Sequence, residues 1–323
     1  MTIWRLNEAA APPVAVEFSA QRVAAASLDV RSGQATIAAY AAEPLAAGAL
    51  VPSLTNTNVA DRPVVVGALG RVFDRLGGRP RRVAVIVPDI VAKVSLVRFE
   101  HVPSRAADLD QLVRWQVRKT APFPIEDAQV SYVPGLRAAD GQEFVVSIAR
   151  REVVKEYESL CEEVGAYPGL VDLATFNVIN AVLAGSTPPS TDWLLIHVTA
   201  DSASTAILRG EHLIFFRNRG ADGDGTLLDL VHQAAMYYED RLEGQGFARV
   251  LLAGMAAVGS RTSDIEQARR SLEERLSRSV ELFDPREGVA LADRITPPPA
   301  LLDALTPMAG VLLRDRENVH AAR

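Results

Sequence analysis

Three segments of this 323-residue chain share one pattern, in which an apolar run that predicts a strand enters a turn of small or polar residues. They span residues 14–28, 193–208 and 250–255. Apolar and β-branched residues favour the strands, and Ser, Thr and Gly at their ends favour the turns. Long stretches with helical spacing separate them. The pattern predicts an α/β chain, in which only the fold can bring these distant turns into one site.

Composition limits the size of the protein and the class of its partners. With 48% hydrophobic and 23% charged residues, 323 residues can bury one large core or two ordinary ones, and we expect two lobes. A net charge of -6 argues against nucleic acid as a partner, since domains that hold phosphate backbones are usually basic. Cys161 is the only cysteine, which excludes an intramolecular disulfide and suits a reducing, cytoplasmic compartment.

No segment predicts a membrane span or an export signal. The longest apolar stretch, Val83 to Val97, is interrupted by Pro88, Asp89 and Lys93. A spanning helix needs about 18 apolar residues without such interruptions. The first residues, Met1 to Glu8, lack the basic region and apolar run of a secretion signal. We therefore expect a protein that is neither spanning nor exported.

The first half of the chain predicts strands followed by helices. Strands at residues 14–17, 23–29 and 35–40 are spaced as an antiparallel meander, and Gly77–Gly78 stops the helix that follows. Ser104 is the expected cap of a later helix, which ends before the rigid corner Pro122–Phe123–Pro124. The other predicted elements here are helices at residues 62–76 and 153–164 and strands at 82–87, 94–99, 130–132 and 144–149.

The run Pro188–Pro189–Ser190 is the best candidate for a linker between two lobes. We expect an N-terminal extension at residues 1–13, a first lobe at 14–187 and a second lobe at 188–323. A helix at residues 176–183 closes the first lobe. The second lobe contains a strand from Trp193, a hairpin at residues 205–217, helices at 227–242 and 262–276, and a strand at 249–253.

Three runs carry a resemblance to a known family: Ala121 to Asp127, Val145 to Arg150, and Gly165 to Leu173. Over most of its length the chain resembles the PilM family of type IV pilus assembly proteins. The resemblance implies a two-lobed, actin-like ATPase fold, similar to the cell-division protein FtsA and to the cytoplasmic part of the secretion protein GspL. It also implies a small subdomain, 1C, inserted into subdomain 1A at about residues 89–165, and a closing helix at Ala309 to Arg314.

The nucleotide clamp that the family offers is altered here. Glu17 stands at the first acid and Ser19 at the first glycine, where a side chain hinders close approach of a phosphate to backbone amides. His197 replaces the second acid, which removes an oxygen ligand for magnesium, and Thr199 replaces its glycine. Met255 follows Gly254 where the nucleoside would lie. These departures predict a scaffold with a filled cleft, without catalytic residues or a metal site.

The alternative is a working ATPase that binds ATP and magnesium. In that case Glu17, Ser19, Gln21, Thr199, Ser202 and Gly254 hold the nucleotide. His197 lies in an apolar strand without a spaced partner, so we expect a hydrogen-bonded structural histidine and not a base or metal ligand.

The resemblance also implies a partner. Members of the family dock the cytoplasmic N-terminal peptide of an inner-membrane protein of the PilN type between subdomains 1A and 1C, which places the protein at the inner face of the membrane, beside other pilus or secretion platform proteins. Peptide capture needs a strand edge and apolar pockets, for which Val94, Leu96, Phe99, Phe123 and Ile125 are the candidates. The alternative is that these side chains pack subdomain 1C.

Overall fold

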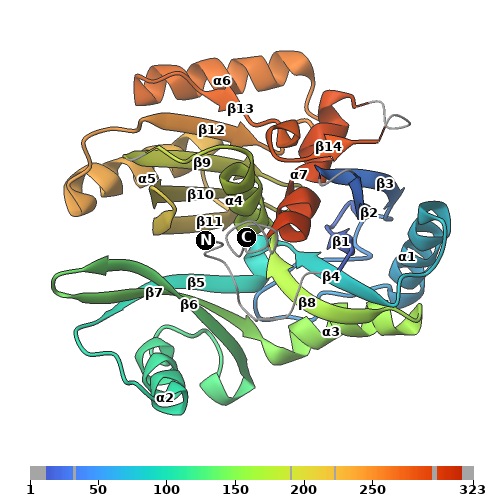
Figure 1. The fold of residues 1–323 in the computed structure, drawn as a ribbon, viewed down its shortest axis with the longest axis horizontal. Helices are drawn as coiled ribbons and strands as arrows, with labels where there is room; N and C mark the ends of the chain where they lie inside the picture. The colour runs from blue at the N-terminus through green and yellow to red at the C-terminus, as the bar shows by residue number, and fades with distance from the viewer. Residues whose placement is uncertain (1–11, 32–33, 190, 222, 293–296, 315–323) are drawn as a thin grey trace.

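The computed structural model describes residues 12–31, 34–189, 191–221, 223–292 and 297–314. These residues form two lobes on separate sheets, and a smaller third sheet extends from the first lobe (Figure 1). Residues 1–11 of the expected N-terminal extension and Ser190 of the expected linker lie outside the described part. Within it, no helix is both long and apolar enough to cross a bilayer.

The first lobe is built on a six-stranded sheet with the order β14-β3-β2-β1-β4-β8. The predicted antiparallel meander is confirmed by the pairing of the first three strands, and β4 and β8 add in parallel. Strand β8 was not predicted from the sequence. The strands are β1 (Val14–Phe18), β2 (Arg22–Arg31), β3 (Gln34–Pro44), β4 (Arg82–Val87), β8 (Tyr167–Leu173) and β14 (Ala290–Leu291).

Helices cover both faces of this sheet. Val16 of β1 faces a core shared with α1 (Arg62–Leu76) and α3 (Arg151–Glu163), whereas its neighbour Ala15 faces a core shared with α7 (Pro299–Leu313). Helix α4 (Ala174–Gly185) packs on α7. Asp61 caps α1 by accepting a bond from the amide of Val64 at 3.2 Å.

The second lobe is a five-stranded sheet with the order β11-β10-β9-β12-β13. The predicted hairpin is confirmed, with Thr205 opposite Arg217. A capping box at Thr226 and Asp229 begins α5. The elements are β9 (Asp192–Val198), β10 (Ser202–Arg209), β11 (His212–Gly220), β12 (Arg249–Ala253), β13 (Glu281–Leu282), α5 (Leu227–Leu242) and α6 (Thr262–Leu276).

The C-terminal part of the chain returns to the first lobe. Strand β14 pairs with β3, and Leu305 and Met308 of α7 are buried against the first sheet. The expectation that residues 188–323 form one lobe did not include this return. The chain returns because one face of the first sheet needs an apolar cover, which α7 supplies.

A three-stranded sheet, β5-β7-β6, forms subdomain 1C together with α2. Helix α2 begins after Arg105 without a side-chain cap, so the predicted cap at Ser104 is wrong. The expected range of 89–165 is also too long, since α3 packs on the first sheet. We define subdomain 1C as β5 (Ala92–Phe99), α2 (Ala106–Val117), β6 (Ala128–Ala138) and β7 (Gly141–Arg150).

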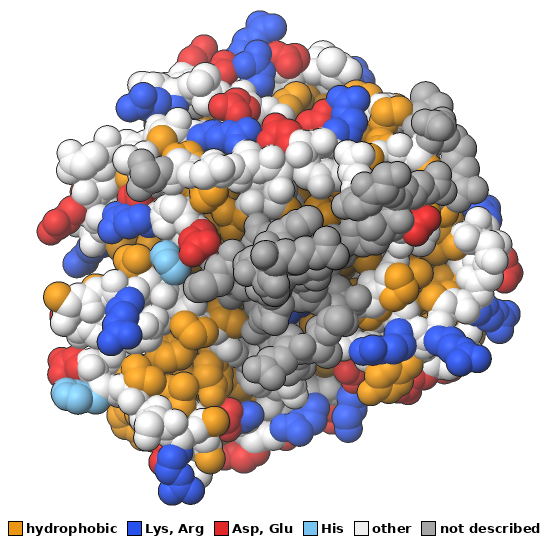
Figure 2. Space-filling model, viewed as in Figure 1, with side chains coloured by type: hydrophobic (Ala, Val, Ile, Leu, Met, Phe, Trp, Pro, Cys, Tyr) orange, Lys and Arg blue, Asp and Glu red, His pale blue; other side chains and the backbone are white. Residues whose placement is uncertain are grey.

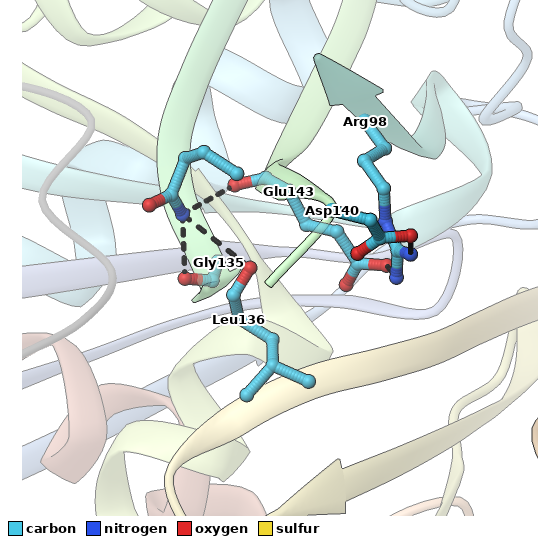
Figure 3. A network of polar contacts seen from close by, with 6 residues as sticks. Arg98, Gly135, Leu136, Asp140 and Glu143 are labelled. Carbon is cyan, nitrogen blue, oxygen red and sulfur yellow. Dashed lines mark hydrogen bonds and ion pairs between the residues drawn. The ribbon is translucent and has the colours of Figure 1, made fainter. Parts of the chain in front are cut away.

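The tip of subdomain 1C reaches the second lobe. The β6–β7 register shifts between Pro134 and Arg137, and the side-chain amide of Gln142 donates to the carbonyl oxygen of Gly135 at 2.9 Å (Figure 3). Arg98 of β5 forms ion pairs with Asp140 and Glu143 and so joins β5 to the β6–β7 hairpin. The bulge places Leu136 against the apolar core of the second lobe. Subdomain 1C therefore extends from the first lobe and also contacts the second.

Cys161 gives a direct test of the packing of α3. It is a free, fully buried thiol, and burial raises its pKa to about 12, with Glu162 and Glu158 adding to the shift. Because the thiolate is the reactive form, we expect no labelling by a disulfide reagent in the native protein and complete labelling in denaturant. Rapid labelling of the native protein would contradict this burial.

Candidate functional site

The three strand-to-turn segments meet between the lobes. They line one cavity of about 30 Å³, which we name the interlobe cleft. Five of the six predicted nucleotide contacts, all except Ser202, line it, and Ser202 lies behind Thr199 with their hydroxyl oxygens 3.4 Å apart. The lining residues are Glu17, Ser19, Gln21, Arg22, His197, Val198, Thr199, Ala200, Gly254, Ala257, Val258, Asp303 and Pro307.

An arginine that the sequence analysis missed crosses the interlobe cleft. Arg22, at the start of β2, lies 3.3 Å from the carboxylate of Glu17 and donates to the carbonyl oxygen of Ala257 at 3.0 Å. The carboxylate that the resemblance placed at the first acid is therefore paired within the chain. The signal in the sequence was a single basic residue between the turn at Ser19 and the apolar run of β2.

Two aspartates bond to backbone amides of the turns. Asp201 accepts from the amide of Ala20 at 3.0 Å, and Asp303 of α7 accepts from the amide of Ala256 at 2.7 Å. Burial raises the pKa of Asp201 to about 6 and also raises the pKa of Asp303. Neither residue belongs to a local motif, so sequence reasoning had no signal for either bond.

His197 belongs to a buried network behind the turns. Its Nδ1 lies 2.8 Å from the hydroxyl of Thr175, which also donates to Asp89. Ser204 donates to the same carboxylate at 2.6 Å. Burial lowers the pKa of His197, which favours the neutral ring. The predicted hydrogen bond of His197 is therefore confirmed, and the side chain is buried.

The interlobe cleft is small in this arrangement. Sites for ligands of that size have volumes of about 300–1,000 Å³, whereas about 30 Å³ holds little more than one water molecule. Gly254 has a φ of 93°, and a Cβ there would lie 2.0 Å from the carbonyl oxygen of Val198. The second and third turns are therefore in direct contact.

A larger cavity of about 430 Å³ lies between the first sheet and subdomain 1C. Its walls are the outermost strand β8, helix α3 and strands β6 and β7. Tyr167, at the start of β8, is 62% exposed. We name this cavity the β8 groove; its lining includes Gln129, Ser131, Ser147, Ala149, Arg151, Val154, Lys155, Glu158 and the residues of β8.

The five residues predicted to bind a partner lie elsewhere, and none lines the β8 groove. Phe99, Phe123 and Ile125 pack in the small core between α2 and the three-stranded sheet. Val94 and Leu96 lie on the edge strand β5, partly buried against the main core. Figure 2 shows hydrophobic side chains at the surface over subdomain 1C, where Val97, Leu109, Leu112, Phe123, Ile125 and Tyr132 are only partly buried.

Comparison with known proteins agrees with this architecture. A family model described as type IV pilus assembly protein PilM matches residues 15–241. No significant match is found among curated proteins. A solved structure described as a PilM-PilN type IV pilus biogenesis complex is 17% identical, with a TM-score of 0.76, and the match covers 95% of this chain and 98% of that chain.

A second solved structure, a Bacteroides thetaiotaomicron protein described as having an actin-like ATPase fold and unknown function, is 11% identical with a TM-score of 0.50. That match covers 85% of this chain and 91% of the other. The fold is therefore the actin-like ATPase fold, and because the family model matches more than half of the sequence, the chain belongs to the PilM family of type IV pilus assembly proteins.

Proposed function

We propose that this chain is a scaffold of a type IV pilus assembly platform, and that its β8 groove captures the cytoplasmic N-terminal peptide of a PilN-like inner-membrane protein. The observation that carries the proposal is a groove of about 430 Å³ beside an outermost strand, in a chain of the PilM family. A relative in complex with PilN supports the identity of the partner. The scaffold then lies at the cytoplasmic face of the inner membrane, held there through the peptide.

The β8 groove has the parts that recognise an extended peptide. Among the described strands β8 is at the end of its sheet, so its outer edge offers backbone donors and acceptors for an added strand. Gln129, Ser131 and Ser147 supply polar groups on the opposite wall. The exposed ring of Tyr167 offers the kind of aromatic anchor that often dominates binding energy.

The proposed scaffold works without ATP or magnesium. The small volume of the interlobe cleft and the Glu17–Arg22 ion pair support this part of the proposal. Calorimetry of the purified protein with ATP and magnesium tests it: we expect neither heat of binding nor a thermal shift. Micromolar binding with turnover would instead support an assembly ATPase.

The groove proposal predicts a loss of affinity on two substitutions. We expect Tyr167→Ala to weaken peptide binding about tenfold or more, the cost typical of a buried aromatic anchor. Ser147→Phe fills the groove from β7 and should abolish binding. Fluorescence anisotropy with the labelled cytoplasmic N-terminal peptide of the PilN-like protein from the same organism measures both effects.

Tyr237→Ala is the matched control, because Tyr237 is 45% exposed on α5 in the other lobe. It should leave peptide affinity unchanged. Circular dichroism melts show whether each variant folds. Wild-type affinity in a folded Ser147→Phe variant would exclude the β8 groove as the peptide site.

A further inference from the structure

Three side chains bridge the lobes across the interlobe cleft. Asp201 of the second lobe accepts from the amide of Ala20 in the first. Asp303, on a helix packed against the first sheet, accepts from the amide of Ala256 in the second lobe. Arg22 of the first sheet donates to the carbonyl oxygen of Ala257. Each bridge ends on a turn that follows a strand: Ala20 follows β1, and Ala256 and Ala257 follow β12.

The two aspartates occupy backbone amides of a kind that binds anions. Amides of tight turns that follow strands form anion-binding concavities, because their N–H groups converge without a competing acceptor. A carboxylate oxygen is a charged acceptor and satisfies such a donor as a phosphate oxygen does. Here the acceptors belong to the chain, at 3.0 Å for Asp201 and 2.7 Å for Asp303.

The charges around the interlobe cleft also disfavour an external anion. Glu17, Asp201 and Asp303 are acidic, and Asp89 lies behind them with no exposed surface. Arg22 is the one lysine or arginine that lines the cleft in the described part of the chain, and Glu17 already pairs with it. A triphosphate in the interlobe cleft would therefore be repelled by the excess negative charge around it.

We propose that Asp201 and Asp303 are built-in anionic ligands of two turns and hold the lobes closed, Asp201 at the turn where a nucleotide phosphate would lie and Asp303 at the turn where the nucleoside would lie. This inference rests on the proposed nucleotide-independent scaffold and deepens it. The chain itself joins the two lobes at these turns. The consequence is one fixed lobe arrangement, and so a fixed spacing between the β8 groove and the second lobe.

Hydrogen exchange followed by mass spectrometry tests the proposal without any peptide. With Asp201→Ala, we expect exchange at residues 19–22 of the opposite lobe to become about tenfold faster, the change that follows from losing a charge-assisted hydrogen bond of roughly 1.4 kcal/mol. Asp303→Ala should have the same effect at residues 254–258. Asp61→Ala removes a similar carboxylate–amide bond at the start of α1 and should change exchange only there.

Two results would overturn the proposal. One is unchanged exchange at both turns in the alanine variants. The other is protection of residues 19–22 and 254–258 when ATP and magnesium are added to the wild-type protein. Asp303→Asn covers the case in which the alanine variant does not fold, because it keeps an acceptor oxygen in a side chain of the same shape. In that variant, the exchange rate at residues 254–258 should rise less than tenfold above the wild-type rate. Peptide affinity is measured separately, so failure here leaves the groove proposal standing.

Discussion

Replacing Asp172 with alanine is expected to lower the free energy of unfolding by about 3–5 kcal/mol. Asp172, next to the last residue of β8, lies 3.4 Å from the guanidinium of Arg314, which follows α7, and both side chains are almost completely buried. Nε and Nη2 of Arg314 have no hydrogen-bond partner among the described residues. Burial raises the pKa of Asp172 to about 6 although Arg314 opposes the shift. Without this carboxylate, a buried positive charge is left uncompensated.

Urea denaturation, followed by circular dichroism, measures the effect. Glu163→Ala is the matched control, because Glu163 pairs with Arg62 at 2.6 Å on the surface, and such pairs contribute about 0–1 kcal/mol. The double variant Asp172→Ala, Arg314→Met should recover much of the lost stability, since it removes both charges. Stability of the single variant equal to that of Glu163→Ala would contradict the role of the ion pair.

The sequence predicted those elements whose ends are set by local chemistry. Helix α1 begins at the cap Asp61 and ends at Gly77, which has a φ of 99°, and both signals lie within one turn of the helix. The bounds predicted for α5 and α6 are also confirmed, because the apolar periodicity is continuous along each helix. Strand β8 was missed because Pro168 and Gly169 interrupt its apolar pattern, and its pairing with β4 overrides that weak propensity.

The candidate sites were predictable only in part. The resemblance placed the turns of Glu17, Thr199 and Gly254 together, and the structure brings them to one cleft. It gave no signal for Asp303, which reaches Ala256 across 47 positions of sequence. The β8 groove is likewise a product of two sheets meeting. Such contacts depend on tertiary packing, which a single sequence does not report.

Helix α7 is the element that joins these features, because it covers the first sheet, carries Asp303 into the interlobe cleft and leads into Arg314. The close packing of α7 against α4 depends on one glycine. A Cβ at Gly310 would lie 1.6 Å from the carbonyl oxygen of Asn177. Since that oxygen is part of a helix backbone, no side-chain rotation relieves the overlap, and the two helices must separate.

Gly310→Ala is therefore expected to cost about 3 kcal/mol or more in the free energy of unfolding, at the upper end for overpacking of a core. Gly70→Ala is its control: Gly70 lies in α1 with no neighbouring atom within 4 Å of the added Cβ, so that variant should be stabilised by up to about 1 kcal/mol. Urea denaturation compares the two. Because a displaced α7 also withdraws Asp303, exchange at residues 254–258 should accelerate only in the Gly310 variant. Equal stability of the two variants would show that α4 and α7 do not pack this closely.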